Sequence, residues 1–203
     1  MQNRDWHVDA DGCCRACKSP RSWDLLKENY RFYRFLTEVE DALELADREV
    51  DCLPTIRKLV RKLTINSYWL QTQYLEPSPK KGDAILLLYD EIGFPLTVQT
   101  ETLMQGQKSS IHNHGTWGVI AILKGQEKNS FWHRTPNSEF DCKIELVEEK
   151  ILHPGDIISF TPDAIHSVEA VSVEPTIAFN IYGETTHSQR FEFDPVNHTA
   201  RNF

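Results

Sequence analysis

The spacing of apolar positions divides the chain into an N-terminal helical part and a longer part made of short strands. From Ser22 to about Leu75, apolar residues recur at three- and four-residue steps, as in helices that bury one face. Ser22 is a suitable N-cap, and Pro54 suits the first turn of a second helix, because proline is tolerated there but breaks a helix interior. The pattern therefore predicts two or three helices before the rest of the chain.

After Pro77, Pro79 and Gly82, the pattern changes to short runs rich in β-branched and aromatic residues. The predicted strands cover residues 84–89, 96–104, 117–123, 127–134, 143–152, 156–161, 167–173 and 176–182. No helical pattern separates them, and strands at such short intervals are typical of an antiparallel barrel or jelly roll.

We expect one mainly β domain in three parts. A mobile, cysteine-containing segment covers residues 1–21, helices that pack on the barrel cover 22–80, and the β-barrel covers 81–203.

Length and charge exclude several classes of function. A chain of 203 residues fits one domain rather than separate cofactor and substrate lobes. With 30 acidic and 22 basic residues, the net charge of -8 disfavours nucleic acid or an anionic membrane as the main partner. No apolar run approaches the roughly 20 residues of a membrane span, and the first residues lack a secretory signal pattern. A cytoplasmic location is expected.

The five cysteines do not suggest a disulfide framework, because three crowd together while Cys52 and Cys142 stand alone. Cys14 and Cys17 have CxxC spacing and could bind zinc together with Cys13 or His7. No second pair of ligands follows to complete such a site. Reduced thiols in a reactive N-terminal segment are therefore the simpler interpretation.

Three histidines form the strongest candidate for chemistry. His112 and His114 lie two residues apart in a predicted strand, so both side chains point to one face and can chelate one metal. His166 follows the Gly155-Asp156 turn and one further strand, and a barrel can bring it beside the first two.

This pattern resembles the first motif of the cupin family, a glycine followed after five residues by His-x-His and later by a second glycine. Gly106, His112, His114 and Gly125 match that motif in register. Gly118 stands where most cupins carry a glutamate ligand. That departure resembles the thiol dioxygenase branch, the cysteine dioxygenases and 3-mercaptopropionate dioxygenases, whose iron is held by three histidines.

The resemblance covers roughly residues 30–195 and includes the Ser67-Tyr-Trp-Leu70, Leu87-Leu-Tyr89 and His114-Gly-Thr-Trp117-Gly118 stretches. It implies a cupin double-stranded β-helix, a jelly-roll barrel with an N-terminal helical layer. The second cupin motif is weaker, because Pro162 and His166 enclose three residues and Ala164 stands near the expected glycine.

The resemblance implies a metal held by His112, His114 and His166. Three neutral imidazoles leave the charge of a divalent ion uncompensated, which favours an anionic ligand such as a thiolate. Iron(II) is the expected cofactor, although imidazole also suits nickel, zinc and other divalent metals.

Two departures concern the reaction and the substrate. Thiol dioxygenases carry a Ser-x-His-x-Tyr relay where this chain has Ala178, Asn180 and Tyr182, so only the tyrosine remains to donate a hydrogen bond. Family members that bind carboxylic thiols carry an arginine where Ala84 stands. The residues proposed as its substitutes are Lys80, Lys81 and Arg134.

The remaining candidates are assigned by their position. Tyr182 is the expected catalytic residue, and Trp117, Gly118 and Asn180 are the expected substrate contacts, although Trp117 could equally be core. Gln99 and Glu101 are interpreted as part of a solvated strand face. The residues given no role are His133, His153, His187, His198 and the structural run 190–195.

The expected function is that of a non-haem iron(II) dioxygenase that adds O2 to the sulfur of a small thiol and forms a sulfinate. The alternatives are another metal-dependent cupin enzyme, an oxygenase, lyase or isomerase for a small polar substrate, or a non-catalytic cupin that binds a metal or small ligand. The expected partners are the thiol and O2, with neither nucleic acid nor membrane, and the barrel edge could form a homodimer.

Overall fold

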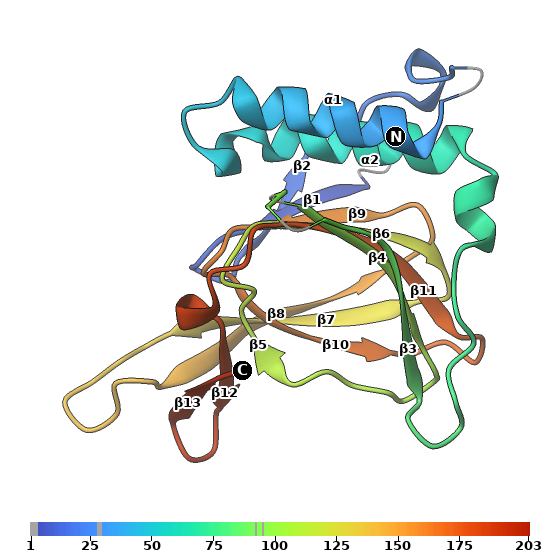
Figure 1. Cartoon of the computed structure of the whole chain (residues 1–203). Coiled ribbons are helices and arrows are strands. Elements are labelled where there is room, and N and C mark those ends of the chain that lie inside the picture. Colours follow the sequence, from blue (N-terminus) through green and yellow to red (C-terminus); the bar gives the residue numbers. More distant parts are fainter. Residues whose placement is uncertain (1–3, 28–29, 92, 95) are drawn as a thin grey trace.

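Two β-sheets face each other and carry a pair of helices on one outer side (Figure 1). The computed structural model describes residues 4–27, 30–91, 93–94 and 96–203. The strands of the first sheet, called sheet A, are in spatial order β2 (Cys14–Cys17), β1 (Asp5–Val8), β9 (Ile157–Phe160), β6 (Gly118–Lys124), β11 (Thr176–Gly183), β4 (Leu96–Leu103) and β3 (Asp83–Asp90).

The second sheet, called sheet B, closes the other side of the barrel. Its strands are in spatial order β13 (Thr199–Asn202), β12 (Phe191–Asp194), β5 (Ile111–His112), β10 (Ile165–Ala170), β7 (Glu127–Arg134) and β8 (Ile144–Leu152). All pairs of strands are antiparallel except β1 with β9. The predicted jelly-roll barrel with a helical layer is confirmed.

Helices α1 (Phe32–Glu44) and α2 (Leu53–Asn66) lie side by side over the outer face of sheet A (Figure 1). Pro54 stands in the first turn of α2, as its fixed φ and missing N–H allow. The helices bury one apolar face each, and Phe35, Ile56 and Leu63 belong to the same core cluster as Val119 and Phe179 of the sheet. This stripe of apolar residues holds the helical layer on the barrel.

The central strands of sheet A are buried on both faces, which explains their nearly continuous apolar sequence. Val119 and Ala121 of β6 face the helices, whereas Ile120 and Ile122 face the barrel interior. Phe131 of β7 packs in the same interior cluster. One strand sequence therefore supplies two separate cores.

The eight predicted strands all occur, with ends that agree within about three residues. The helical prediction was wrong in detail. Ser22 is the first residue of a short 3-10 helix (Ser22–Asp24) rather than an N-cap, and further 3-10 helices span Glu49–Cys52, Trp69–Thr72 and His187–Gln189. Leu25 and Tyr30 are buried as their spacing predicted and Leu26 is exposed, but no α-helix of the described residues precedes Phe32.

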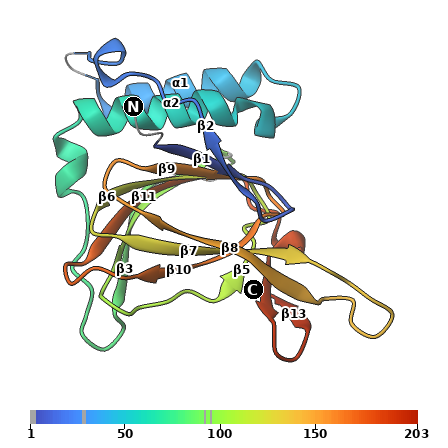
Figure 2. The same ribbon diagram turned by 180° about the vertical axis from the view of Figure 1, so that it is seen from behind.

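The prediction of a mobile segment over 1–21 was wrong for much of its length, while residues 1–3 lie outside the described residues. Strands β1 and β2 form a hairpin, and β1 continues sheet A by pairing with β9 (Figure 2). Val8 is fully buried in the interior core. Burial raises the pKa of the Cys14 thiol to about 12, so this cysteine is not a reactive thiolate at neutral pH.

Helix α2 fastens this hairpin with two buried arginines. Arg61 forms an ion pair with Asp5, and its Nη1 donates to the carbonyl of Gly155 at 3.0 Å. Arg57 Nη1 donates to Ser159 Oγ at 2.5 Å, and Ser159 is also 3.0 Å from His7 Nδ1. His7 is thereby engaged with Ser159, and no metal-ligating cluster of described residues includes it or the N-terminal cysteines.

Within the described part of the chain, no helix combines the length and apolar character needed to cross a membrane.

Replacing Arg61 with Leu should lower the free energy of unfolding by about 3 to 5 kcal/mol, because the Asp5 carboxylate stays buried without its partner. Urea denaturation measures this loss. The matched control is Arg48→Leu, which removes an exposed pair with Asp51 and should cost about 0 to 1 kcal/mol. Equal losses in the two variants would show that the buried pair does not hold the hairpin.

Candidate metal centre

Two of the three candidate histidines stand opposite each other on neighbouring strands. β5 pairs with β10 through His112 and His166, which places their side chains on the same face of sheet B. His112 is also paired with Glu192 of β12, and His166 with Phe131 of β7. The antiparallel register alone therefore brings two imidazoles together that are far apart in the sequence.

His114 reaches the pair from a loop, because β5 ends at His112. The Asn113 side chain holds this loop: its Nδ2 donates to the carbonyls of Pro162 and Gln189, and its Oδ1 accepts from the Phe191 backbone. Gly115 follows with a φ of +63°, and a side chain there would place Cβ 2.8 Å from the Thr186 carbonyl oxygen. Asn113 and Gly115 therefore position His114.

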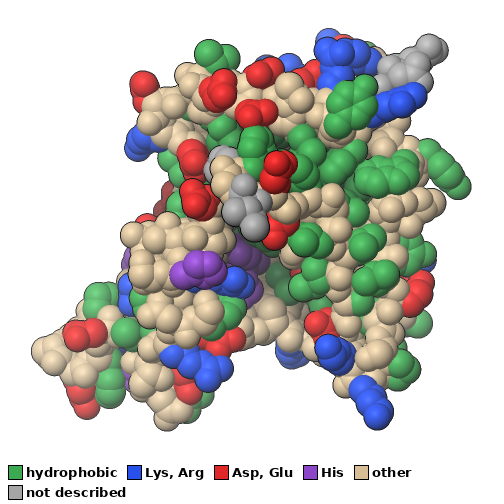
Figure 3. Space-filling view, in the orientation of Figure 1, with side chains coloured by type: hydrophobic (Ala, Val, Ile, Leu, Met, Phe, Trp, Pro, Cys, Tyr) green, Lys and Arg blue, Asp and Glu red, His purple; other side chains and the backbone are tan. Residues whose placement is uncertain are grey.

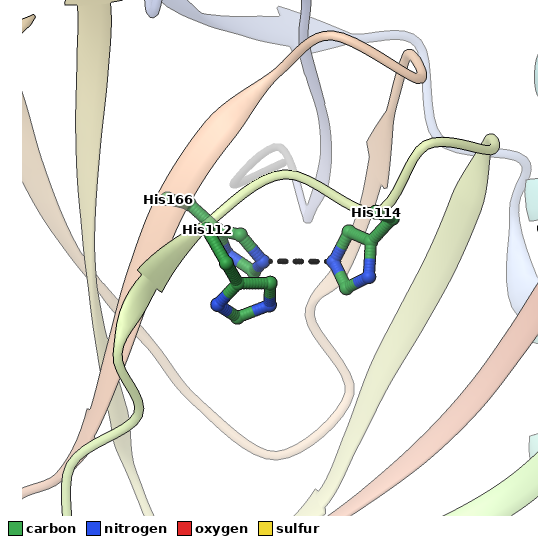
Figure 4. Close-up of side chains that lie close together, drawn as sticks. All are labelled: His112, His114 and His166. Atoms are coloured by element: carbon green, nitrogen blue, oxygen red, sulfur yellow. Dashed lines mark hydrogen bonds between the residues drawn. The ribbon is translucent and has the colours of Figure 1, made fainter. Parts of the chain in front are cut away.

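The three rings point toward one another at the wall of the barrel (Figure 4). Ring centroids are 4.9 Å apart for His112 with His114, 4.9 Å for His112 with His166, and 5.0 Å for His114 with His166. The Nε2 atoms of His114 and His166 are 2.9 Å apart. Two nitrogens that bind one ion at about 2.1 Å and at a right angle lie about 3.0 Å apart, so this spacing fits a shared metal.

Neighbouring groups orient two of the imidazoles through Nδ1. His112 Nδ1 lies 3.0 Å from the Ser110 carbonyl, and His166 Nδ1 lies 3.2 Å from Asn129 Oδ1. Both partners accept a hydrogen bond, so each Nδ1 carries the proton and each Nε2 keeps a free lone pair. Asn129 Nδ2 in turn donates to Glu127 Oε1 at 2.8 Å, which extends the chain from His166 to a buried carboxyl.

Burial keeps the three histidines neutral. It lowers the pKa of His112, and it lowers the pKa of His114 and His166 well below the usual value, with repulsion from the neighbouring imidazoles adding to the effect. Neutral imidazole is the form that binds a metal. Among the described residues, these three histidines are the group that could hold an ion.

Tyr182 lies against this group. Its ring centroid is 4.8 Å from that of His114, and burial raises the pKa of its hydroxyl, with Glu101 and Glu127 contributing. The hydroxyl therefore stays protonated and able to donate a hydrogen bond. A Cβ at Gly118 would lie 3.0 Å from the Tyr182 ring, so the glycine makes room for the tyrosine rather than for a substrate.

The histidines and Tyr182 line one cavity of about 540 Å³, a volume typical of small-ligand sites. Histidine atoms are visible beside a hollow on the face of the molecule shown in Figure 3. The cavity is polar at its walls: Gln99, Glu101, Glu127 and Asn180 contribute to its lining. It therefore suits a small polar molecule that contacts the three histidines.

Two predicted substrate contacts do not line the cavity. Trp117 is 1% exposed, belongs to the core under the helices, and donates from Nε1 to Glu49 Oε2 at 2.9 Å. Gly118 contacts the Tyr182 ring. Asn180 does line the cavity, and its Nδ2 lies 3.4 Å from Glu101 Oε2. The prediction that Gln99 and Glu101 mark a solvated face was wrong, because that face of β4 points into the barrel.

Other cavity residues were missed from the sequence. Glu127 lines the cavity from the start of β7, and Asn129 orients His166 from the same strand. The strand begins with four polar residues, Glu-Lys-Asn-Ser, so no alternation with apolar residues signalled an inward face. Arg190 lines the cavity, although its segment was interpreted as structural. Neither Ala84 nor its proposed substitutes Lys80, Lys81 and Arg134 line the cavity, whereas Asp83 and Ile85 do.

No family model matches the chain. Its fold is similar to that of a cupin superfamily protein from Desulfitobacterium hafniense, with 12% identity and a TM-score of 0.44, covering 57% of this chain and 87% of the other. A conserved protein with a double-stranded β-helix domain from Klebsiella pneumoniae shows 16% identity and a TM-score of 0.43, with coverage of 57% and 88%.

Recombinant oxalate oxidase in complex with glycolate is also similar, with 12% identity and a TM-score of 0.43, covering 56% of each chain. At such identities and scores, the jelly-roll assignment rests on the strand order and register described above. One of these solved structures is described as a cupin superfamily protein and another as a protein with a double-stranded β-helix domain.

Proposed function

We propose that the protein is a non-haem iron(II) dioxygenase that adds O2 to the sulfur of a small thiol. The observation that carries the proposal is the cluster of three neutral histidines, two buried and one half-buried, that contains no carboxylate ligand. A divalent ion held there keeps its full charge, so it favours an anionic ligand and lowers the pKa of a thiol that it binds.

Iron(II) bound by His112, His114 and His166 would supply open positions for a thiolate and for O2. In the overall reaction, both oxygen atoms of O2 are added to sulfur, which is oxidised from thiol to sulfinic acid. O2 is the only oxidant, and no external reductant is consumed. The residues of this chain therefore need to bind, orient and shield the reactants.

Tyr182 is the proposed catalytic residue. Its hydroxyl is held in the protonated form, and its ring lies against His114. In the cavity it can donate a hydrogen bond to the sulfur or to an oxygen atom beside the histidines. Ala178 has no polar group, and the side-chain amide of Asn180 does not titrate. Neither residue of β11 can therefore pass a proton to or from Tyr182, which acts by its own hydrogen bond.

The absence of a relay favours a second candidate, another metal-dependent cupin enzyme that acts on a small polar substrate. Such an enzyme would use the same three histidines and the same cavity, but not thiol oxidation. A panel of substrates separates the two candidates, because only the first consumes O2 when a thiol is added.

Replacing His166 with Ala should lower the affinity for cobalt(II) or iron(II) at least about a hundredfold, because it removes a ligand rather than a group that only orients one. Isothermal titration under anaerobic conditions measures the affinity. His153→Ala is the control, since that side chain is exposed and outside the group of three. Unchanged affinity in His166→Ala would exclude this metal centre.

Metal affinity should depend weakly on pH. Three histidines with an ordinary pKa of about 6.5 would lose about fiftyfold in metal affinity between about pH 7.5 and pH 6.0, because protons compete for every ligand. The lowered pKa values here keep the ligands neutral over this range, and we expect a loss below about fivefold. A fiftyfold loss on titration with cobalt(II) would contradict the neutral cluster.

Iron-loaded protein should consume O2 with a small thiol and form the sulfinate. Tyr182→Phe should lower kcat about tenfold at unchanged iron content, through loss of one hydrogen bond to a charged group. Gly118→Ala should lower kcat as well, because its Cβ displaces the Tyr182 ring. Tyr89→Phe is the control, since its hydroxyl bonds Glu91 outside the cavity.

Two outcomes would contradict the proposal. No O2 uptake with any small thiol, at confirmed iron occupancy, would favour the second candidate. Uptake that persists unchanged in His112→Ala would show that the reaction does not take place at the three histidines.

A further inference from the structure

One wall of the cavity is acidic. Glu101 of β4 and Glu127 of β7 both line it, Asp83 of β3 stands nearby, and Asn180 of β11 lies beside Glu101. Glu127 is 2% exposed, and Asn180 is 1% exposed. We call Glu101, Glu127 and Asn180 the acidic wall. Its members come from both sheets, so the closure of the barrel brings them together.

The two carboxyl groups have no cationic partner among the described residues. Glu101 bonds Asn180, Glu127 bonds Asn129, and neither forms an ion pair within that part of the chain. Burial raises the pKa of Glu101 and raises the pKa of Glu127 to about 7; repulsion from Asp83 adds to the shift of Glu101, and repulsion from Glu101 adds to that of Glu127. A cation bound between them would relieve this repulsion and stabilise both charges.

Asn180 provides an independent observation. Its Oδ1 atom is buried in the cavity lining and has no hydrogen-bond donor among the described residues. A buried acceptor without a donor is costly, so the cavity has a place for a donor group. The Asn180 Oδ1 and the free oxygens of ionised Glu101 and Glu127 are all acceptors, and a bound cation would favour the ionised form of both carboxyl groups, which suits a cationic ligand that only donates.

The two basic residues of the cavity lining, Lys108 and Arg190, do not pair with the acidic wall, and the buried Nε of Arg190 has no hydrogen-bond partner among the described residues. Lys108 pairs with Glu169 at 3.2 Å, outside the acidic wall. The Arg190 guanidinium lies 4.2 Å from the centroid of the Phe203 ring and lowers the pKa of His112, His114 and Tyr182. Its positive charge therefore acts on the histidines and Tyr182, and neither basic residue forms an ion pair with Glu101 or Glu127 in the described part of the chain.

We propose that the acidic wall is a subsite for an ammonium group, so the cavity selects a small aminothiol over thiols with a neutral or carboxylate tail. An ammonium group has three donors and no acceptor, which matches the three acceptors of the wall. The sulfur would lie at the histidines and the ammonium group at the acidic wall, in the one cavity that Tyr182 also lines. The placement of the sulfur depends on the proposed function, whereas the argument for the ammonium subsite depends only on the acidic wall.

Cobalt(II)-loaded protein without O2 tests the selection with three thiols of similar size, aminoethanethiol, mercaptoethanol and mercaptopropionate. The absorption band of a cobalt thiolate gives the dissociation constant of each. We expect aminoethanethiol to bind about tenfold more tightly than mercaptoethanol, and mercaptopropionate to bind most weakly. In Glu101→Gln and Glu127→Gln, aminoethanethiol and mercaptoethanol should bind within about twofold of each other.

Glu174→Gln is the matched control, because this exposed carboxylate pairs with Lys124 and lies outside the cavity. It should keep the tenfold preference. Glu101 is only partly buried, so Glu101→Gln provides the test if Glu127→Gln does not fold.

Metal-free protein tests the subsite without any thiol chemistry. Titration with n-propylammonium should shift the side-chain amide resonance of Asn180, and propanol or propionate at the same concentrations should not. Magnesium chloride is a further probe, and an equal shift with Mg²⁺ would overturn the ammonium subsite in favour of a metal cation.

The outcomes separate the two proposals. Cobalt thiolate bands with equal affinity for all three thiols overturn the ammonium subsite and leave the proposed function standing. The opposite result is that no thiol gives a cobalt thiolate band, while propylammonium alone shifts the Asn180 resonance. That result overturns the proposed function and supports the ammonium subsite. No band and no shift overturn both.

Discussion

The burial of sheet A on both faces is the constraint on which the rest of the structure depends. Helices α1 and α2 cover one face and sheet B covers the other, so β6 and β11 contribute to two cores at once. This arrangement leaves the registers of β6, β9 and β11 little freedom, because a shift of one residue would exchange the two faces. The polar cavity is therefore enclosed by strands that are held from outside.

Fixed strands allow the barrel to carry buried polar groups that would otherwise be costly. His166, Asn129 and Glu127 form one chain of hydrogen bonds, and Asn113 satisfies three backbone groups around His114. The charges of the cavity are unevenly balanced: Arg190 lowers the pKa of His114, whereas Glu101 and Glu127 have no cationic partner among the described residues. The electrostatic asymmetry is thus a property of the fold as well as of the three histidines.

Alternation and turn residues were sufficient to predict the strands and the jelly roll, because each strand is a local pattern. The three histidines that the structure brings together were also identified, since their motif lies in one short segment and His166 follows a recognisable turn. Whether they bind a metal stays a prediction.

The lining of the cavity could not be predicted in the same way. Polar alternation in β4 looks identical whether the polar face meets solvent or a closed barrel interior, and only the closure by sheet B decides between them. Trp117 was ambiguous for a similar reason, because the helices that bury it lie far away in sequence. Arg190 reaches the cavity through the path of the C-terminal segment, for which no local pattern gives a signal.

The contact between Gly118 and Tyr182 also limits how such a site can change over time. Any side chain at position 118 would begin 3.0 Å from the tyrosine ring, so a fourth protein ligand from this position requires the ring to leave its present place by a few tenths of an ångström. The residue at position 118 and the position of the Tyr182 ring are therefore coupled, so a substitution that adds a ligand to the centre also moves the hydroxyl that faces it.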